Sequence, residues 1–164
     1  MGSALAMGLA AMIVLGIVSI FSKSEGNKQL DILKNPNDVD GNLVAGIKLF
    51  NDDKFDEALA HFHNINRKIN PQTTSLADIY IGRIHFNRSE FEEAKNLFLT
   101  VIENKSILME EHGDGIAFTY FLLGYINFHE GKYSNAKQFK KIAINMNSDF
   151  LKFTFPPYEE YIEI

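Results

Sequence analysis

Few residues of this chain have the types and spacing that catalysis or metal binding requires. The 164-residue sequence holds five His and no Cys, so thiolate chemistry and disulfides are excluded. His61 and His63 are close in sequence, but residues i and i+2 of a helix point apart, whereas two ligands from one helix need i and i+4. Carboxylate pairs such as Glu92–Glu93 are adjacent and typical of a solvated face. The sequence therefore predicts no enzyme activity, cofactor, metal site or small-molecule substrate.

Composition directs attention to apolar contacts instead. The formal net charge is -5 and no cluster of Lys and Arg occurs, which argues against a nucleic-acid partner because phosphate binding needs such clusters. Hydrophobic residues make up 46% of the chain, with 14 Phe and no Trp. These residues are sufficient for a real core, and they favour binding to another protein.

The N-terminal segment predicts a membrane anchor. Residues 4–21 form an uncharged stretch of 18 residues. This is the length at which a transmembrane helix is expected. A cleaved signal peptide is the rival interpretation, but the segment lacks a basic n-region and a suitable cleavage site. Lys23, Lys28 and Lys34 follow the span, so the positive-inside rule places the soluble part in the cytoplasm. We therefore expect a single-pass membrane protein with an anchor at residues 1–22 and a juxtamembrane linker at residues 23–37.

An internal repeat is the strongest signal in the chain. Three segments align without a gap, and each reads Gly, an aromatic residue four positions on, another aromatic five after that, and Ala three further. The repeated quartets are Gly46, Phe50, Phe55, Ala58; Gly82, Phe86, Phe91, Ala94; and Gly124, Phe128, Tyr133, Ala136. Gly and Ala let two helices approach closely, and the second aromatic begins the second helix of a hairpin.

This pattern resembles the tetratricopeptide repeat (TPR) family over residues 38–148. A further aromatic of the family signature matches Phe62 and Phe98, slips by one to Phe139 in the third repeat, and Pro71 closes the first repeat. The resemblance implies an all-α, TPR-type solenoid of three helix hairpins. The wider spacing of the last two repeats predicts a longer loop or an extended helix end at residues 104–115, and residues 149–164 form an aromatic and acidic tail.

Polar residues mark where the helices are expected to begin. Asp38, Asp53 and Asp114 are candidate N-caps, and Ser75 and Ser89 begin capping boxes or near variants of them.

The concave face is the predicted binding surface. In TPR proteins it is lined by the first helix of each repeat, and some members use Lys, Arg and Asn there as a carboxylate clamp. The corresponding positions here are apolar, so a protein partner with an apolar or amphipathic segment is expected. The predicted partner-binding residues are Leu43, Ile47, Phe50, Asn51, Ile79, Arg83, Phe86, Asn87, Phe118, Phe121, Tyr125, Phe128 and His129. Asn51, Asn87 and His129 are placed to hydrogen-bond a bound backbone.

The first helix of the third repeat is apolar on nearly all sides, from Ile116 to Phe128. Such a helix requires cover all round. Three explanations remain open: the tail at residues 149–164 covers it, a partner's segment lies in the groove, or the rings fill the core of a short, strongly curved solenoid.

The sequence therefore predicts a membrane-anchored protein–protein interaction module, either an adaptor or an accessory subunit of a membrane complex. A receptor for amphipathic targeting or signal segments, similar to N-anchored TPR import receptors, is the alternative.

Overall fold

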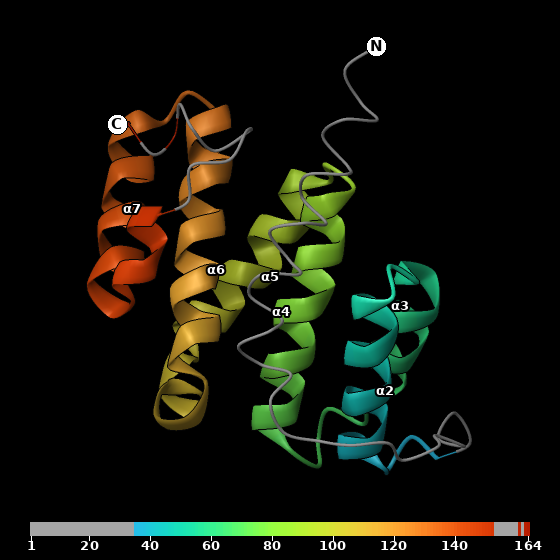
Figure 1. Cartoon of the computed structure of the whole chain (residues 1–164). Coiled ribbons are helices and arrows are strands. Elements are labelled where there is room, and N and C mark those ends of the chain that lie inside the picture. The colour runs from blue at the N-terminus through green and yellow to red at the C-terminus, as the bar shows by residue number, and fades with distance from the viewer. Residues whose placement is uncertain (1–34, 153–160, 162) are drawn as a thin grey trace.

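The computed structural model describes residues 35–152, 161, 163 and 164, without the side chains of residues 110, 111, 151 and 152. Within residues 35–152 the chain forms six α-helices and no strand, which confirms the all-α prediction. Figure 1 shows them as a row of three antiparallel hairpins. The helices are α2 (Val39–Asn51), α3 (Phe55–Asn64), α4 (Pro71–Asn87), α5 (Phe91–Glu103), α6 (Met109–His129) and α7 (Tyr133–Met146), with two 3-10 helices, η1 (Lys105–Ile107) and η2 (Ser148–Lys152).

Each hairpin pairs two consecutive helices, and its second helix begins at an aromatic residue. Phe55 is the first residue of α3, Phe91 of α5 and Tyr133 of α7. The ring of Phe55 lies 5.6 Å from that of Phe50 on α2, and Phe91 lies 5.5 Å from Phe86 on α4. The aromatic residue therefore packs back on the first helix and sets the angle at which the chain returns.

The three hairpin turns share one backbone geometry. In the first turn the N–H of Asp53 donates to the carbonyl of Phe50 and the N–H of Lys54 donates to that of Leu49, which is the Schellman pattern that ends a helix. The same two bonds recur in the other turns. The residue at the centre has a left-handed φ in all three: 58° at Asp53, 61° at Ser89 and 72° at Gly131. The N-cap predictions at Asp53 and Ser89 are wrong, because these residues end the first helix instead of starting the second.

The glycines of the first two repeats mark the closest approach of two helices. A Cβ atom built on Gly82 would lie 2.5 Å from a ring carbon of Phe98, and one built on Gly46 would overlap the ring of Phe62. Both rings are fully buried. Since no side chain fits between the helices at these points, the glycine and the ring form one packing unit within each hairpin.

The starts of α2 and α4 agree with the sequence predictions only in part. Asp38 caps α2 as predicted, its carboxylate accepting from the N–H of Gly41 at 3.0 Å. α4 begins earlier than the capping box at Ser75 predicts, because Asn70 caps it and Pro71 is its first residue. Proline suits that position, where its missing N–H has no partner to lose.

The residues inserted between the second and third repeats extend the last hairpin. They form η1 and the first turns of α6, which favours the extended helix end over a loop. The helix bends at His112, where φ and ψ are -129° and 30°. Leu108 anchors the insert because its side chain is fully buried. Asp114, a predicted N-cap, lies inside α6 and accepts a hydrogen bond from Asn147 beyond α7.

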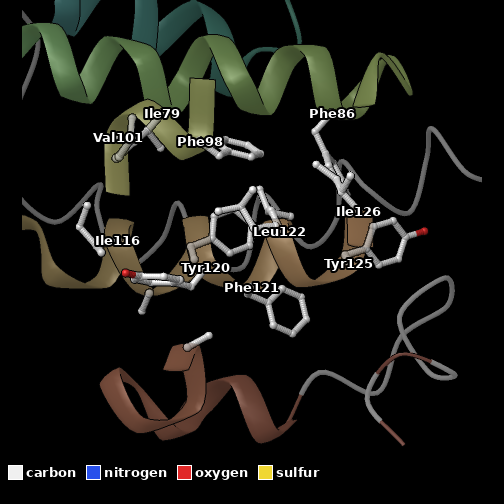
Figure 2. Close-up of a cluster of buried hydrophobic side chains, with 14 of the residues drawn as sticks. Ile79, Phe86, Phe98, Val101, Ile116, Tyr120, Phe121, Leu122, Tyr125 and Ile126 are labelled. Atoms are coloured by element: carbon white, nitrogen blue, oxygen red, sulfur yellow. The ribbon is translucent and has the colours of Figure 1, made fainter. Parts of the chain in front are cut away.

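Buried side chains join each hairpin to the next. Tyr80 of α4 contacts the rings of Phe50 and Phe62 in the first hairpin at 5.3 and 5.6 Å. Phe86 of α4 contacts Tyr125 of α6 at 5.3 Å. Figure 2 shows the larger cluster, in which side chains from α4 and α5 reach toward α6. The buried hydrophobic residues therefore form two clusters that meet at α4, where the half-buried Leu76 packs against both.

The predicted anchor at residues 4–21 and most of the linker at residues 23–37 lie outside the described residues. No helix in the described part of the chain is long and apolar enough to span a bilayer.

Candidate interaction surface

The predicted partner-binding residues lie on α2, α4 and α6, the first helix of each hairpin. Most of them are buried rather than lining an open groove. The buried members are Leu43, Phe50, Ile79, Arg83, Phe86, Phe118, Phe121 and Tyr125; Ile47, Asn51, Asn87 and Phe128 are half-buried and His129 is exposed. The accessible part of this predicted surface therefore combines two apolar residues, Ile47 and Phe128, with the polar residues at the ends of the three helices.

Arg83 joins the three first helices. Its guanidinium carbon lies 4.6 Å from the ring centre of Phe50 on α2 and 5.1 Å from that of Phe118 on α6, and Tyr80 on its own helix lies at 5.0 Å. Arginine stacks on aromatic faces because its charge is delocalised and weakly hydrated. Burial raises the pKa of Tyr80, and the nearby Arg83 charge opposes this rise. Arg83 is thus a central packing element of the row.

Asn51, Asn87 and His129 occupy the same position in the three hairpins, one residue after the repeated aromatic. The side-chain oxygen of Asn51 is buried and accepts no hydrogen bond from the described residues. A buried acceptor without a donor is costly, and each such case in a folded protein calls for an explanation. The ring of His129 is stacked on Phe91 at 5.9 Å and lies tilted against Tyr125 at 4.4 Å. These residues form a polar edge beside the buried rings.

Four aromatic residues form a stripe along α6: Phe118, Phe121, Tyr125 and Phe128. Residues from the end of the chain cover this aromatic stripe. Phe150 stacks on Phe118 and Phe121 at 6.1 and 5.3 Å. Tyr161 lies 5.2 Å from Phe121, and it also contacts Tyr125 and Phe128 at 6.1 and 5.9 Å. Figure 2 shows Phe121 on the side of α6 turned toward α7. Of the three explanations for the apolar helix, the described residues therefore favour cover by the chain's own tail.

Tyr161 also replaces the ring that the third hairpin lacks. Its hydroxyl and ring lie against Gly124, where an added Cβ would overlap them. The predicted equivalent, Phe139, is half-buried and packs 6.1 Å from Tyr120 instead. The assignment of Phe139 as the third ring is therefore wrong. The ring over the third glycine comes from 37 residues further along the chain, whereas Phe62 and Phe98 belong to the hairpins that they close.

Lys140 stands at the place in α7 that corresponds to Phe62 and Phe98. Each phenylalanine follows its glycine by 16 residues, and the residue 16 positions after Gly124 is Lys140. The lysine is buried, and its Nζ donates to the main-chain oxygens of Tyr161 and Ile164, both at 3.3 Å. Burial, and next the charge of Lys137, lowers the Lys140 pKa. The tail thus contributes both the missing ring and the oxygens that this ammonium needs.

Burial also shifts the pKa values of two further titratable side chains in the hairpins. His61 is buried and lies 3.3 Å from the side-chain oxygen of Asn42, and burial lowers its pKa, against the effect of Glu57. His63 on the same helix is exposed, so the two histidines point apart. Burial raises the pKa of Tyr125 to about 12. At neutral pH both His61 and Tyr125 are uncharged.

The sequence reasoning did not identify Lys140 or Tyr161 as site residues. One signal was available: the interval that carries Phe in two repeats carries a lysine in the third. A charged residue at a buried repeat position indicates that another segment supplies both the apolar side chain and polar partners.

Neither a scan of protein-family profiles nor searches of curated proteins and of solved structures found a match to this chain.

Proposed function

We propose that this chain is a membrane-anchored protein–protein interaction module. Its three hairpins are TPR repeats, and it works as an adaptor or an accessory subunit of a membrane protein complex. The observation that carries the proposal is the recurrence of one hairpin with equivalent residues in equivalent places. A row of stacked repeats presents a long composite surface, and proteins built in this way use that surface to bind other proteins.

The TPR assignment rests on local geometry as well as on spacing. In the first two hairpins the small residue of the first helix meets a ring of the second, as at Gly82 and Phe98. The aromatic residue begins the second helix in all three hairpins, and the alanines of the signature, Ala58, Ala94 and Ala136, are fully buried. These features support a TPR-type solenoid.

The polar edge on the first helices is the proposed contact with the partner. Ile47 and Phe128 on these first helices are half-buried, as are Asn51 and Asn87, so apolar and amide groups are both partly accessible to a bound segment. The side-chain oxygen of Asn51 is buried and has no donor among the described residues, so it accepts from a partner's N–H once the side chain rotates toward the surface. The proposed partner segment is therefore amphipathic, with an apolar side and exposed backbone or amide donors.

The proposed anchor is the uncharged segment at residues 4–21, with the soluble part in the cytoplasm. The intact chain should remain with membranes through carbonate and high-salt washing, and a chain beginning at Gly26 should not. Recovery of the intact chain in the soluble fraction would contradict the anchor and leave the hairpin proposal untouched.

Partner binding is tested by replacing the amides of the polar edge. Asn51→Leu with Asn87→Leu removes two hydrogen-bonding groups, and at Asn51 it also removes a buried unsatisfied oxygen, so folding should be preserved. Loss of two hydrogen bonds should weaken partner binding by about tenfold or more. The matched control is Asn96→Leu, at an exposed position of α5.

The measurement is affinity capture from membranes solubilised in mild detergent, with quantitative mass spectrometry of the retained proteins. We expect a stoichiometric partner on the wild type and on the Asn96→Leu control, and its loss from the double variant. If all three chains retain the same proteins equally, the polar edge is not the binding surface. A changing set of transient amphipathic segments, instead of one fixed partner, would indicate a receptor.

A further inference from the structure

The third hairpin contains a site for an aromatic side chain that its own two helices do not fill. Gly124 of α6 leaves a space beside Ala136 of α7, and the hydroxyl end of the Tyr161 ring occupies it. Tyr161 is fully buried, and Phe121 and Phe128 line the space with rings 5.2 and 5.9 Å away. The site therefore has a glycine floor, an aromatic wall and an occupant from a distant segment.

A buried ammonium group completes the site. Lys140 stands beside the occupant, with Nζ 5.7 Å from the Tyr161 ring centre. It donates to the main-chain oxygens of Tyr161 and Ile164. Both of these acceptors are main-chain atoms, so the two hydrogen bonds do not require a particular side chain on the tail. The ring space then selects the side chain three residues before the second oxygen.

The resident side chain fits the site imperfectly. The Tyr161 hydroxyl is buried, and none of the described residues hydrogen-bonds to it. At the corresponding places the first two hairpins use Phe62 and Phe98, which have no hydroxyl. Since burying a hydroxyl without a partner is unfavourable, a phenylalanine should enter the third site at a smaller desolvation cost than the tyrosine that occupies it.

We propose that the α6–α7 hairpin is a binding site for a short peptide segment with an aromatic residue, preferably phenylalanine, and that Tyr161 and Ile164 of this chain belong to its resident, exchangeable ligand. The site goes beyond the proposed function, because it lies at the end of the row and does not use the polar edge. A segment with Phe in place of Tyr161, followed by apolar and acidic residues as in the tail, is the chemistry that would displace the resident.

The test uses the intact chain in mild detergent, with Tyr161→Ala to empty the ring space. Fluorescent hexapeptides with the sequences EEYIEI, EEFIEI and EEAIEI are titrated, and binding is followed by fluorescence anisotropy. EEYIEI should bind the Tyr161→Ala chain saturably and bind the wild type about tenfold or more weakly, because a tethered tail competes at up to millimolar effective concentration. EEFIEI should bind several-fold more tightly than EEYIEI, and EEAIEI should not saturate.

Two substitutions in α6 distinguish peptide binding at this site from non-specific binding of the peptide elsewhere on the chain. Gly124→Ala, added to the Tyr161→Ala chain, should abolish peptide binding, because its Cβ fills the ring space. Gly113→Ala is the matched control, since a Cβ there meets nothing within 4 Å, and it should leave peptide binding unchanged. Equal binding of EEFIEI and EEAIEI, or equal binding by the Gly124→Ala and Gly113→Ala chains, would overturn the proposal.

A second readout covers the case in which Tyr161→Ala unfolds the last hairpin. EEFIEI should then restore the lost helicity seen by circular dichroism, and failure to restore it would also overturn the proposal. Independently of any added peptide, the intact Tyr161→Phe chain should melt at a higher temperature than the wild type. A lower melting temperature would show that the hydroxyl is needed and that the stated preference is wrong.

Discussion

The first two hairpins and the third solve the same packing problem in different ways. In each, a glycine on the first helix brings a second segment too close for any side chain on that glycine, and an aromatic ring covers it. Phe62 and Phe98 come from the second helix of the same hairpin, whereas Tyr161 comes from the tail. The place of the ring in α7 is taken by Lys140, which binds the tail's main-chain oxygens.

This difference separates self-contained units from one that depends on a distant segment. A ring carried by the partner helix is held by the hairpin itself, and it leaves only when the hairpin opens. A ring carried by the tail can leave while α6 and α7 remain paired, because local opening of a terminal segment requires less free energy than global unfolding. Releasing the tail from the third hairpin should therefore require less free energy than separating the two helices of any hairpin.

The largest expected contrast comes from removing the two kinds of ring. Phe98→Ala should destabilise the chain by about 3–5 kcal/mol, as expected for a buried aromatic ring. Tyr161→Ala should cost less, roughly 1–3 kcal/mol, since the loss cannot exceed the free energy of docking the tail. Denaturant unfolding of both variants in the same detergent, followed by circular dichroism, measures the difference. Equal losses would mean that the tail is as integral to the fold as the second helices are.

Replacing two glycines of α6 by alanine should have smaller effects on stability, and the two effects should be opposite in sign. Gly124→Ala should cost about 1–2 kcal/mol by overpacking against Tyr161. Gly113→Ala in the same helix should raise stability by about 0.5–1 kcal/mol, because alanine is the better helix former and the site is open. In the double variant Gly124→Ala, Tyr161→Ala the two losses should not add, since both remove the same contact. Additive losses would show that the two residues act independently.

The hairpin turns also differ from one another. Here the third hairpin has the residue better suited to the left-handed backbone conformation of the turn. Gly131 has the left-handed φ that glycine adopts without strain, whereas Ser89 has a φ of 61° at the equivalent place. Ser89→Gly should therefore stabilise the chain by about 0.5–1 kcal/mol, and Gly131→Ala should destabilise it by about 1 kcal/mol. Thermal melts of the two variants and the wild type provide the check. A loss of stability in Ser89→Gly would mean that the serine side chain makes a compensating contact.

The smallest expected effect concerns the ion pairs that join the hairpins. Glu130 after α6 accepts from Lys132 at 2.6 Å and from Lys95 of α5 at 2.8 and 2.9 Å, and these bonds, that of Lys132 first, lower its pKa. A carboxylate whose pKa is lower in the folded state stabilises fully above its unfolded pKa, and this contribution is lost as pH falls through the folded value. The loss should stay within about 1 kcal/mol.

Glu130→Gln should remove that part of the pH dependence in acid denaturation. Asp56, which pairs with Arg88 between the first two hairpins, is the control because its side chain is 92% exposed. Asp56→Asn should change stability by no more than a few tenths of a kcal/mol at any pH of the acid denaturation. A Glu130→Gln chain that loses stability on acidification as the wild type does would exclude Glu130 as the source.

How far the sequence could predict the fold depends on how local each contact is. The Gly46–Phe62 and Gly82–Phe98 contacts join residues 16 positions apart, and the aromatic starts of α3, α5 and α7 belong to single turns. A repeated spacing reveals such contacts directly. The N-cap predictions at Asp53 and Ser89 failed for a local reason as well: polar residues also tolerate the left-handed end of a helix, and composition alone does not distinguish the two places.

The candidate surface was less predictable because its state depends on contacts between hairpins. Helical periodicity placed Phe50, Arg83 and Phe118 on the first helices. It could not show that one guanidinium packs against rings from all three hairpins. Nor could it show which of the predicted residues stay accessible, since burial is set by neighbours that lie far apart in sequence.

The sequence by itself determined the number of hairpins, their helical class and the register of their closest approaches, because each follows from residues within one repeat. Only the tertiary structure decided which segment closes the third hairpin. Tyr161 lies 37 residues beyond Gly124, and no periodicity links the two. Their contact forms because Gly124 has no side chain, so the tail residue Tyr161 can lie against it, and because the Lys140 ammonium donates to two main-chain oxygens of the tail.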